Sequence, residues 1–580
     1  MRKWTVTFLL ALISMVAFAQ PSSGLESLND PIFSFMGNGG YDALEYKIDL
    51  KFSDDKRSVT GSTTMTANAT QDLSSLNLDF GGMTVSSVLV DGQAAKFEHD
   101  DPELKIWPAR GLIKGKSFQV RVEYDGQPRT KVARAKDFGV WNVSSHGLLA
   151  LGEPSLMFTW APVNDHPSDK ALFEIKLTAA KIDQAISNGE RISRIENADG
   201  TATTVYRIPT PTATYFVVLA VGDWKLEEDQ KVGNVRVRNY FAPTTQEQTR
   251  KVVAATPTIL KFFSDLLGPY PFAEAGVLTY SGDVFPALET QGLIALPTEY
   301  AERYELDYHT EIVAHEFAHQ WFGALMTFKT HQDIFIHEGF AQYLGWLYTI
   351  SSFPVGLDYV EQNIRFEYPS FVNRERTYAF ANQADFFSSL RPNLGERSLS
   401  RDQVATALGL IFADSMPSSV RDTLLSQMDA QGWTFRGLIL KLGKLKFSKV
   451  VLSAHSYEEL LRLSGTDLKI EPPEVYTPPG KLTVNDKLFN SGVYNRGAAA
   501  LHALRLRIGD DRFWKLVRSF LDAHRFGNAN NQEWLEHVQT QTDAATRSFH
   551  ERWLMDDLVP DFPELGLKAS DYQIGSDLKP

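Results

Sequence analysis

The spacing of apolar residues changes once along the chain, near residue 226. Before that point, from about residue 41, apolar and polar positions alternate, as in the run Tyr46, Ile48 and Leu50. Period-two runs of this kind, separated by Asp-Gly turn pairs, are typical of half-buried antiparallel strands. The pattern therefore predicts an all-β domain over residues 25–225.

Beyond residue 226 most apolar positions recur every three or four residues. The stretch 244–272 shows this spacing, with Pro257 interrupting it and Gly268-Pro269 ending it. Such a period predicts helices, and Gly followed by Pro is a common helix terminus. We therefore predict an α+β multidomain protein in which the β domain is followed by a mainly helical second half.

The helical pattern weakens between about residues 371 and 475, although two shorter runs there keep helical spacing. A Pro/Gly-rich stretch at 469–481 is typical of a linker, and helical spacing returns after it. These changes divide the second half into residues 226–370, 371–475 and 476–570.

Composition excludes several classes of protein. The chain has 580 residues, a formal net charge of −13 and no cysteine. A surface that follows nucleic-acid phosphates needs clustered Lys and Arg, and the sequence shows no such cluster, so we expect no nucleic-acid partner. The absence of cysteine excludes disulfides, thiolate metal ligands and cysteine nucleophiles. Any metal ion must be held by histidine and carboxylate side chains.

The first 19 residues have the features of a cleavable export signal. Arg2 and Lys3 precede an apolar run that extends to about residue 18, and Ala17 and Ala19 match the small-residue pattern before a cleavage site. A membrane anchor needs about 18–20 apolar residues, and this run is shorter and interrupted. We expect an exported protein, periplasmic or secreted, with no stable membrane span after signal cleavage.

The stretch HEFAHQWFG at residues 315–323 is the strongest candidate for a chemical site. Residues i and i+4 of a helix lie one above the other, so His315 and His319 can bind one ion while Glu316 lies beside it. The alternative is an ordinary amphipathic helix whose histidines make only structural hydrogen bonds. Zn²⁺ favours imidazole and carboxylate ligands, and a catalytic site keeps one position for water.

Glu338 is the candidate third ligand. It lies 19 residues beyond His319, near the start of a second predicted helix, DIFIHEGFAQYLGWLY (333–348). A short turn and an antiparallel return would bring it opposite the histidine pair. The predicted centre is one Zn²⁺ ion per chain, held by His315, His319 and Glu338 with one water. Glu316 would be the general base that accepts the water's proton and passes it to the leaving amine.

HEFAHQWFG followed by HEGFAQYL resembles the HExxH-x18-E signature of the gluzincin metallopeptidases, and specifically the M1 aminopeptidase family. Four further stretches resemble that family in the same order: the amino-terminal strands, GEPSLMFTWAPVNDHPSDKA (152–171), FPALETQGLIALP (285–297) and VYNRGAAALHALR (493–505). The resemblance implies an antiparallel β saddle or sandwich domain followed by a mainly helical, thermolysin-like zinc peptidase domain.

The resemblance also implies residue roles. Tyr494 would donate a hydrogen bond to the oxyanion, and Glu289 and Glu153 would bind the ammonium group of a peptide substrate with a free N-terminus. The structural alternatives are a packed aromatic side chain for Tyr494 and solvated surface carboxylates for the two glutamates. Two buried carboxylates near a metal are unfavourable unless a cation lies between them. The implied function is that of an exported zinc aminopeptidase.

The sequence departs from the family pattern around the site. The loop reads PALET where the family has G-A-M-E-N, so Phe285, Pro286 and Leu288 would reshape the first specificity pocket. Ala324 and His331 replace the polar residue and the tryptophan usual in the family. Asp333 is a candidate hydrogen-bond partner for a ligand histidine, with capping of the second helix as the alternative.

Chain length departs from the family as well. Glu338 and Tyr494 are 156 residues apart, farther than is usual in the family, which implies an atypical helical insertion at 371–475. The insertion would be either a cap over the mouth of the cleft, limiting substrate length, or a peripheral addition without catalytic effect. Only 86 residues follow Tyr494, which implies a short form lacking the large C-terminal helical domain of many relatives.

Two other functions stay open. One is a different zinc hydrolase on the same scaffold: an endopeptidase if Glu289 and Glu153 do not converge, or an epoxide hydrolase as in one branch of the family. The other is a binding protein that keeps a structural zinc without turnover. Retention of Glu316 and Tyr494 argues against the binding protein, because a purely structural site needs neither side chain.

Overall fold

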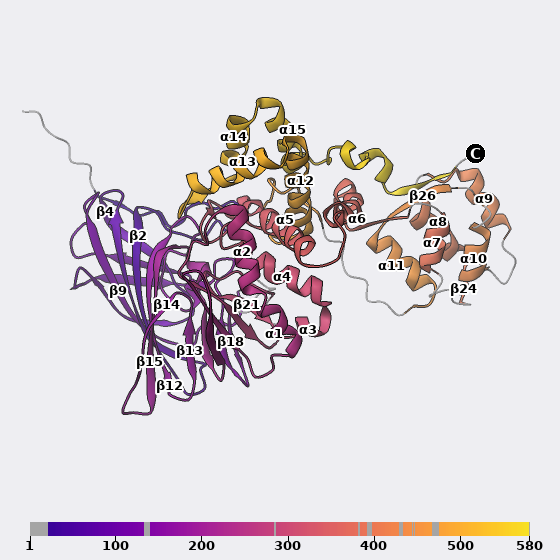
Figure 1. Cartoon of the computed structure of the whole chain (residues 1–580). Helices are drawn as coiled ribbons and strands as arrows, with labels where there is room; N and C mark the ends of the chain where they lie inside the picture. The colour runs from indigo at the N-terminus through magenta and orange to yellow at the C-terminus, as the bar shows by residue number, and fades with distance from the viewer. Residues whose placement is uncertain are drawn as a thin grey trace, which may run out of the picture.

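The structure is a computed structural model of the chain (Figure 1). It describes residues 21–578 apart from 133–139, 283–285, 381–382, 391–396, 414, 428–432, 443–444, 446 and 467–474. The predicted export signal at 1–19 and Phe285 lie outside the described residues. Among the described helices, none combines the length and the apolar character that crossing a membrane requires.

An eight-stranded sheet is the largest element of the N-terminal part. Its strands in spatial order are β14 (Glu190–Glu196), β15 (Thr201–Thr212), β12 (Ala171–Ala180), β2 (Tyr41–Phe52), β3 (Val59–Ala69), β9 (Ser117–Gly126), β5 (Thr84–Val90) and β6 (Gln93–Ala94). Neighbours are antiparallel except for the parallel pair β12 and β2. In β2 the alternating residues Tyr46, Ile48 and Leu50 are buried, as the period-two pattern predicts.

Two four-stranded sheets complete the β domain. The first contains β1 (Ser22–Ser23), β4 (Leu73–Asp79), β8 (Glu103–Trp107) and β7 (Lys96–Asp100), and the second contains β10 (Trp141–Ser144), β11 (Gly147–Ala150), β16 (Leu219–Gly222) and β13 (Gln184–Ser187). Apolar side chains of all three sheets meet in one core, which includes Ile48, Leu78 and Val221. This arrangement confirms the prediction of a β-rich first domain.

A smaller sheet joins the β domain to the helices. Its strands are β17 (Lys225–Val232), β18 (Val235–Phe241), β20 (Val277–Tyr280) and β21 (Ile294–Pro297), and β19 (Glu274–Ala275) also pairs with β18. The helices that follow in sequence around it are α1 (Glu247–Val253), α2 (Thr256–Leu267), α3 (Tyr300–Arg303), α4 (Leu306–Ala318), α5 (Phe335–Ser352) and α6 (Tyr359–Asn373). As predicted, α2 ends at Gly268, whose φ of 105° suits glycine.

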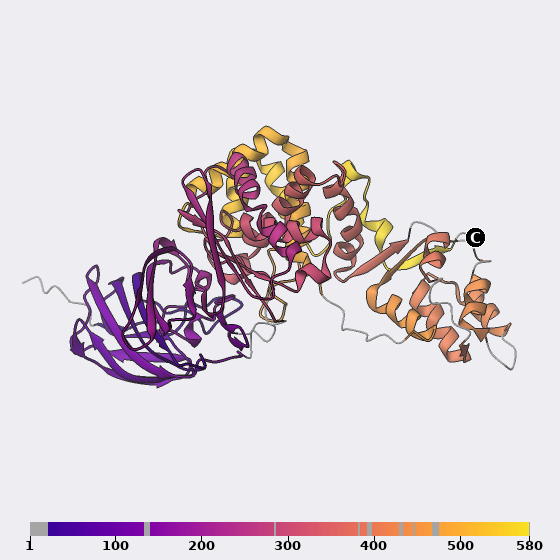
Figure 2. The ribbon, with the colours of Figure 1, turned by 60° about the horizontal axis from the view of Figure 1, so that its bottom comes forward.

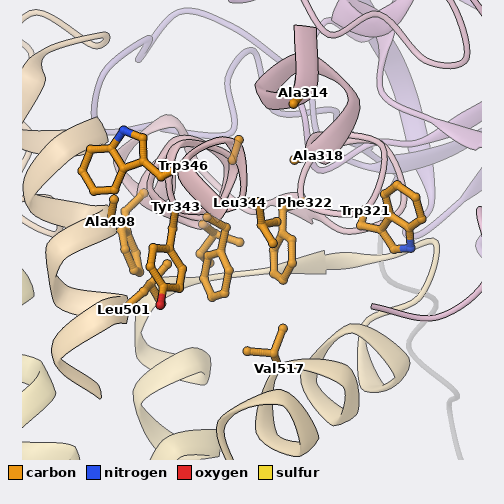
Figure 3. Packing of buried hydrophobic residues seen from close by; sticks show 14 of the residues in the cluster. Ala314, Ala318, Trp321, Phe322, Tyr343, Leu344, Trp346, Ala498, Leu501 and Val517 are labelled. Atoms are coloured by element: carbon orange, nitrogen blue, oxygen red, sulfur yellow. The ribbon is translucent and has the colours of Figure 1, made fainter. Parts of the chain in front are cut away.

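Four late helices share one hydrophobic core with α4 and α5, and α12 packs directly on α5. They are α12 (Gly497–Ile508), α13 (Asp510–Ala523), α14 (Asn531–Gln541) and α15 (Ala544–Met555). Figure 3 shows Phe322, Leu344, Leu501 and Val517 from this common core. Burying one large apolar side chain contributes about 1.5–3 kcal/mol, so this core holds the helices that carry the predicted site. The helical second half of the fold prediction is thereby confirmed.

The described part of residues 371–475 forms a separate lobe (Figure 2), and its buried apolar side chains form a core of their own. Its helices are α7 (Gln383–Leu390), α8 (Arg401–Phe412), α9 (Ser418–Ser426), α10 (Phe435–Leu442) and α11 (Ala454–Leu463). It also contains β23 (Thr377–Phe380), β24 (Ser398–Leu399), β25 (Trp433–Thr434) and β26 (Phe447–Ser453), so the predicted helical insertion has strands as well as helices. The chain end, β28 (Gly575–Leu578), pairs with β26. Short apolar runs such as Val450 to Leu452 have no distinguishing period. Of the two strands that pair with β26, β23 and β28, the second lies more than a hundred residues away.

Candidate metal centre and active site

The three predicted metal ligands lie together at the junction of α4 and α5. His315 Nε2 is 3.1 Å from His319 Nε2, and Glu338 Oε2 is 3.2 Å from the first and 3.4 Å from the second. Zinc bonds of about 2.0–2.1 Å at tetrahedral angles separate neighbouring ligand atoms by about 3.3 Å. The three side chains therefore fit three corners of a zinc site, with the fourth position left for water or substrate.

The backbone after α4 sets the tautomer of His319. His319 Nδ1 lies 3.0 Å from the carbonyl oxygen of Phe322, to which only a protonated nitrogen can donate, so Nε2 keeps its lone pair for a metal. The chain turns sharply here, and a Cβ at Gly323 would lie 2.6 Å from the His319 carbonyl oxygen. Glycine at 323 thus allows the turn that orients the ligand.

Glu338 dominates the electrostatic interactions among the three candidate metal ligands. Burial alone raises a carboxyl pKa, but the neighbouring imidazoles of His319 and His315 outweigh burial and hold the pKa of Glu338 well below its usual range. For His319, burial opposes protonation, yet Glu338 and Glu289 raise its pKa to about 10. The raised pKa of His319 reflects carboxylates that favour a positive charge at this place, and a divalent ion would supply that charge to all three side chains at once.

Glu316 lies in the same cavity, on the α4 face that carries His315 and His319. Burial, together with the carboxylates of Glu289 and Glu338, raises its pKa well above the usual carboxyl value, against the opposing effect of His319. A raised pKa makes a carboxylate a better proton acceptor. Glu316 therefore lies where a general base is needed, beside the candidate metal ligands.

Glu153 and Glu289 converge beside the triad. Carboxylate oxygens of Glu153, Glu289 and Glu338 all lie within 4.8 Å of one another. Burial, then the charge of Glu289, raises the pKa of Glu153 well above its usual value, while Glu289 Oε1 is buried without a hydrogen-bond partner among the described residues. Neither side chain is a solvated surface carboxylate, and the pair would be stabilised by a bound cation such as an ammonium group.

Gln320, one residue beyond the HExxH segment, holds the loop that carries Glu289. Its side-chain amide donates to the Glu289 carbonyl oxygen at 3.1 Å, and its Oε1 accepts from the Gly292 amide at 2.7 Å. These two hydrogen bonds join the C-terminal end of α4, which carries the candidate histidine ligands, directly to the loop that carries Glu289. Sequence reasoning missed this role, since nothing in the local pattern around Gln320 indicates a partner thirty residues earlier.

Tyr494 reaches the cavity from a short π-helical turn, η5 (Gly492–Arg496), just before α12. Its ring stacks on the His315 ring with centroids 5.8 Å apart. Two glycines allow this approach of α12 to α5, because a Cβ at Gly497 would lie 3.0 Å from the Gly339 Cα. Single π turns inside helices are frequent at functional sites, and here the turn places the phenol beside a metal ligand.

All seven predicted site residues line one open cavity of about 310 Å³. Ten further residues complete the described lining: Pro286, Ala287, Leu288, Tyr300, Tyr304, Tyr308, Glu311, Ile312, Gln342 and Phe489. The predicted pocket residues Pro286 and Leu288 are among them. The described lining includes no residue of the 371–475 lobe, which gives no support to the predicted cap over the cleft.

Asp333 does not contact a ligand histidine. Its carboxylate accepts hydrogen bonds from Thr330 and from the Asn531 amide, so of the two predicted roles the structure favours capping, at the 3₁₀ turn η3 (His331–Asp333) that precedes α5. His331 also has a structural role. Its Nε2 lies 3.0 Å from the Pro154 carbonyl oxygen and its Nδ1 3.0 Å from Asp30 Oδ2.

Sequence reasoning overlooked the cavity residues that precede the HExxH segment. Tyr308, Glu311 and Ile312 lie seven, four and three residues before His315, so they share its helix face, and they line the same cavity. A signal for them was present in the spacing, but an acidic residue on a helix face is usually solvent-exposed. Only burial of Glu311 against α5 and α6 distinguishes it.

Comparison with known families supports the same assignment along most of the chain. The family model for the Peptidase M1 N-terminal domain matches residues 42–216, and that for the Peptidase family M1 domain matches 255–380 and 451–553. The gap between the last two ranges lies inside the 371–475 lobe.

Curated relatives match over shorter stretches. The chain is 30% identical over 205 residues to endoplasmic reticulum aminopeptidase 1 of Mus musculus. The matched stretch covers 33% of this chain and 22% of that protein. It is 24% identical over 280 residues to the leucyl aminopeptidase of Saccharolobus solfataricus. Here the matched stretch covers 46% of this chain and 34% of that protein. The chain thus spans about a fifth to a third of the length of these relatives.

Solved structures match over nearly the whole chain. The M1 zinc metallopeptidase from Deinococcus radiodurans superposes with a TM-score of 0.65 at 23% identity, covering 93% of this chain and 99% of that one. A mutant of that protein bound to a Tyr-Ser-Ala substrate gives a TM-score of 0.66 at 24% identity, covering 93% and 100%. These likenesses show a shared fold. Taken with the two family matches, they establish that the chain belongs to peptidase family M1 and carries the N-terminal and catalytic domains of that family.

Proposed function

We propose that the protein is a zinc aminopeptidase that removes N-terminal amino acids from peptides. The observation that carries the proposal is the placement of two buried carboxylates, Glu153 and Glu289, within 4.8 Å of the metal ligand Glu338. This pair can bind a free ammonium group next to the scissile bond. An endopeptidase would be expected only if these carboxylates did not converge.

The chemistry divides among a few side chains. When bound by His315, His319 and Glu338, one Zn²⁺ per chain would supply a Lewis acid for the scissile carbonyl and for the attacking water. Glu316 accepts the proton of that water and passes it to the leaving amine. Tyr494 donates its hydroxyl hydrogen bond to the developing oxyanion.

Peptide substrates and export belong to the same proposal. The related Deinococcus radiodurans protein has been solved with a bound tripeptide, which supports peptides with a free N-terminus as substrates here. The basic start, apolar run and small residues of positions 1–19 support export to the periplasm or the medium.

The proposal is tested with an unblocked aminoacyl chromogen and its N-acetylated twin. We expect cleavage of the free-amine substrate alone, because the acetylated twin offers no cation to Glu153 and Glu289. Equal cleavage of both would point to an endopeptidase. Stoichiometric zinc without cleavage of any peptide would favour a non-catalytic binding role.

Replacing Glu289 by glutamine should weaken recognition of the free amine. We expect kcat/KM for unblocked peptides to fall by about ten- to a hundredfold, the usual effect of losing a hydrogen bond to a charged group. The measurement is steady-state kinetics on the free-amine and acetylated pair. If the variant kept the full preference for the free amine, Glu289 would not be part of the amine site.

Replacing Tyr494 by phenylalanine should lower kcat and leave KM nearly unchanged. The phenyl ring can keep the stack on His315 but has no donor for the oxyanion, and loss of one such donor lowers kcat by about 10²–10³. Zinc content serves as the control for an intact centre. A variant with normal kcat would assign Tyr494 to packing only.

A further inference from the structure

The cavity continues past the metal ligands toward the start of α4. One face of this helix lines it at helical spacing, through Tyr308, Glu311, Ile312, His315, Glu316 and His319. The first three of these residues have no part in the chemistry proposed above. They lie where a peptide chain would extend if its first residue occupied the amine site.

The direction of a bound peptide follows from the positions of the carboxylates. Glu289 lies within 4.8 Å of His319, at the end of α4, and Glu153 lies within 4.8 Å of Glu338. A helix rises about 1.5 Å per residue, so Glu311 lies about 6 Å along the axis from His315 and about 12 Å from His319. A peptide whose ammonium group is held by Glu153 and Glu289 would pass the metal ligands and place its next residues near Glu311.

Glu311 is a buried carboxylate held in a fixed position. It is only 3% exposed, and its Oε2 accepts hydrogen bonds from the Thr349 hydroxyl of α5 at 2.9 Å and the Tyr359 hydroxyl of α6 at 2.8 Å. Among the described residues, no hydrogen bond is made to its Oε1. The described lining of the cavity contains no Lys or Arg, so no cation of the protein itself lines the cavity beside this carboxylate.

Three tyrosines in ring contact with one another line the same cavity. The rings of Tyr300 and Tyr304 meet edge to face with centroids 5.0 Å apart, and those of Tyr304 and Tyr308 do so at the same distance. All three line the cavity together with Glu311. Aromatic faces attract cations, and long aliphatic stems pack well on them. A carboxylate beside a row of tyrosines is suited to a lysine or arginine side chain.

We propose that Glu311 and Tyr304 with Tyr308 form a subsite that selects a basic side chain in the first two residues after the scissile bond. This inference rests on the proposed aminopeptidase function and names its substrate class: peptides with Lys or Arg close behind the N-terminal residue. A buried carboxylate without a cationic partner is unfavourable, and a bound basic side chain would relieve that cost.

A purely structural role is the competing explanation, because Glu311 joins α4 to α5 and α6 through Thr349 and Tyr359. The two roles differ in what Glu311→Gln changes. The glutamine keeps an oxygen that accepts from both hydroxyls but removes the charge. A structural defect lowers kcat/KM for all peptides alike, whereas loss of the subsite lowers it selectively for basic peptides.

The test uses tetrapeptides with alanine first and either lysine or norleucine at the second or third position. Norleucine keeps the aliphatic stem of lysine without the charge. Burial raises the pKa of Glu311 to about 7, against the hydrogen bonds from Tyr359 and Thr349, so the assay is run above that value. For the wild type we expect kcat/KM to favour lysine at one of the two positions by about tenfold or more.

In Glu311→Gln the lysine-to-norleucine ratio should fall to near one. The matched control is Glu305→Gln, which removes an equal charge from the exposed residue that precedes α4 and should leave the ratio at the wild-type value. A ratio that is the same in the wild type and in Glu311→Gln, at both positions, would overturn the subsite. If the wild type cleaved none of these free-amine peptides, the proposed function itself would fail, which is a distinguishable result.

Discussion

Replacing Glu316 by glutamine should reduce kcat by about 10²–10⁴, the usual contribution of a positioned general base, while zinc binding is retained. Glutamine has nearly the same shape and would occupy the same buried place on α4, but its amide cannot accept the proton of the attacking water. The metal ligands His315, His319 and Glu338 are unchanged by the substitution.

The measurement combines peptide turnover with the zinc content of the purified variant. Zinc near one ion per chain together with strongly reduced turnover is the expected result. Loss of zinc along with turnover would show that the Glu316 carboxylate mainly stabilises the centre electrostatically. Glu316 interacts electrostatically with His319 and Glu338. Turnover within tenfold of the wild type would remove the base assignment.

Removing the metal should abolish activity altogether. Chelation is expected to reduce peptide cleavage to background, and added Zn²⁺ should restore it, whereas Mg²⁺ should not, because a site of two imidazoles and one carboxylate suits zinc and Mg²⁺ demands oxygen ligands. Activity that survives exhaustive chelation, with no zinc remaining on the protein, would contradict a metallopeptidase.

Substitution of one ligand gives the same test without a chelator. We expect His319→Ala to lose both zinc and turnover, because it removes one of three ligand atoms that lie 3.1–3.4 Å apart. His309→Ala is the matched control: His309 is buried on the same helix, and neither of its ring nitrogens has a hydrogen-bond partner among the described residues. Zinc loss in His309→Ala as well would show only that α4 tolerates no truncation.

The metal centre was predictable because its geometry is local. His315 and His319 are one helical turn apart, and Glu338 returns on the next helix after a short connection, so few alternative arrangements exist. The proposed amine site is harder to predict, since Glu153 and Glu289 come from different domains and only the family resemblance implies that they meet. For Asp333 the sequence allows two roles, a hydrogen bond to a ligand histidine or helix capping. Both use the same carboxylate, and which one occurs depends on which of these partners lies nearer in the fold.

Other features could not be predicted, because they depend on contacts between residues far apart in sequence. The pairing of β26 with β28 joins segments more than a hundred residues apart, and His331 is held by Asp30, which lies 301 residues earlier in the chain. The sequence around Glu311 does not distinguish it from a surface glutamate. Its burial and its hydrogen bonds from Thr349 and Tyr359 depend on how α4 packs against α5 and α6.

The division into a β domain and a helical part, the candidate metal ligands and the adjacent candidate base could all be predicted from the sequence. Periodicity and short-range helix geometry encode these directly. Packing between distant segments brings two carboxylates from separate domains to the candidate metal ligands, and it leaves the 371–475 lobe out of the described cavity lining. It also decided that Glu311 faces the cavity beside three tyrosines. These outcomes depend on how distant segments pack, which no local pattern specifies.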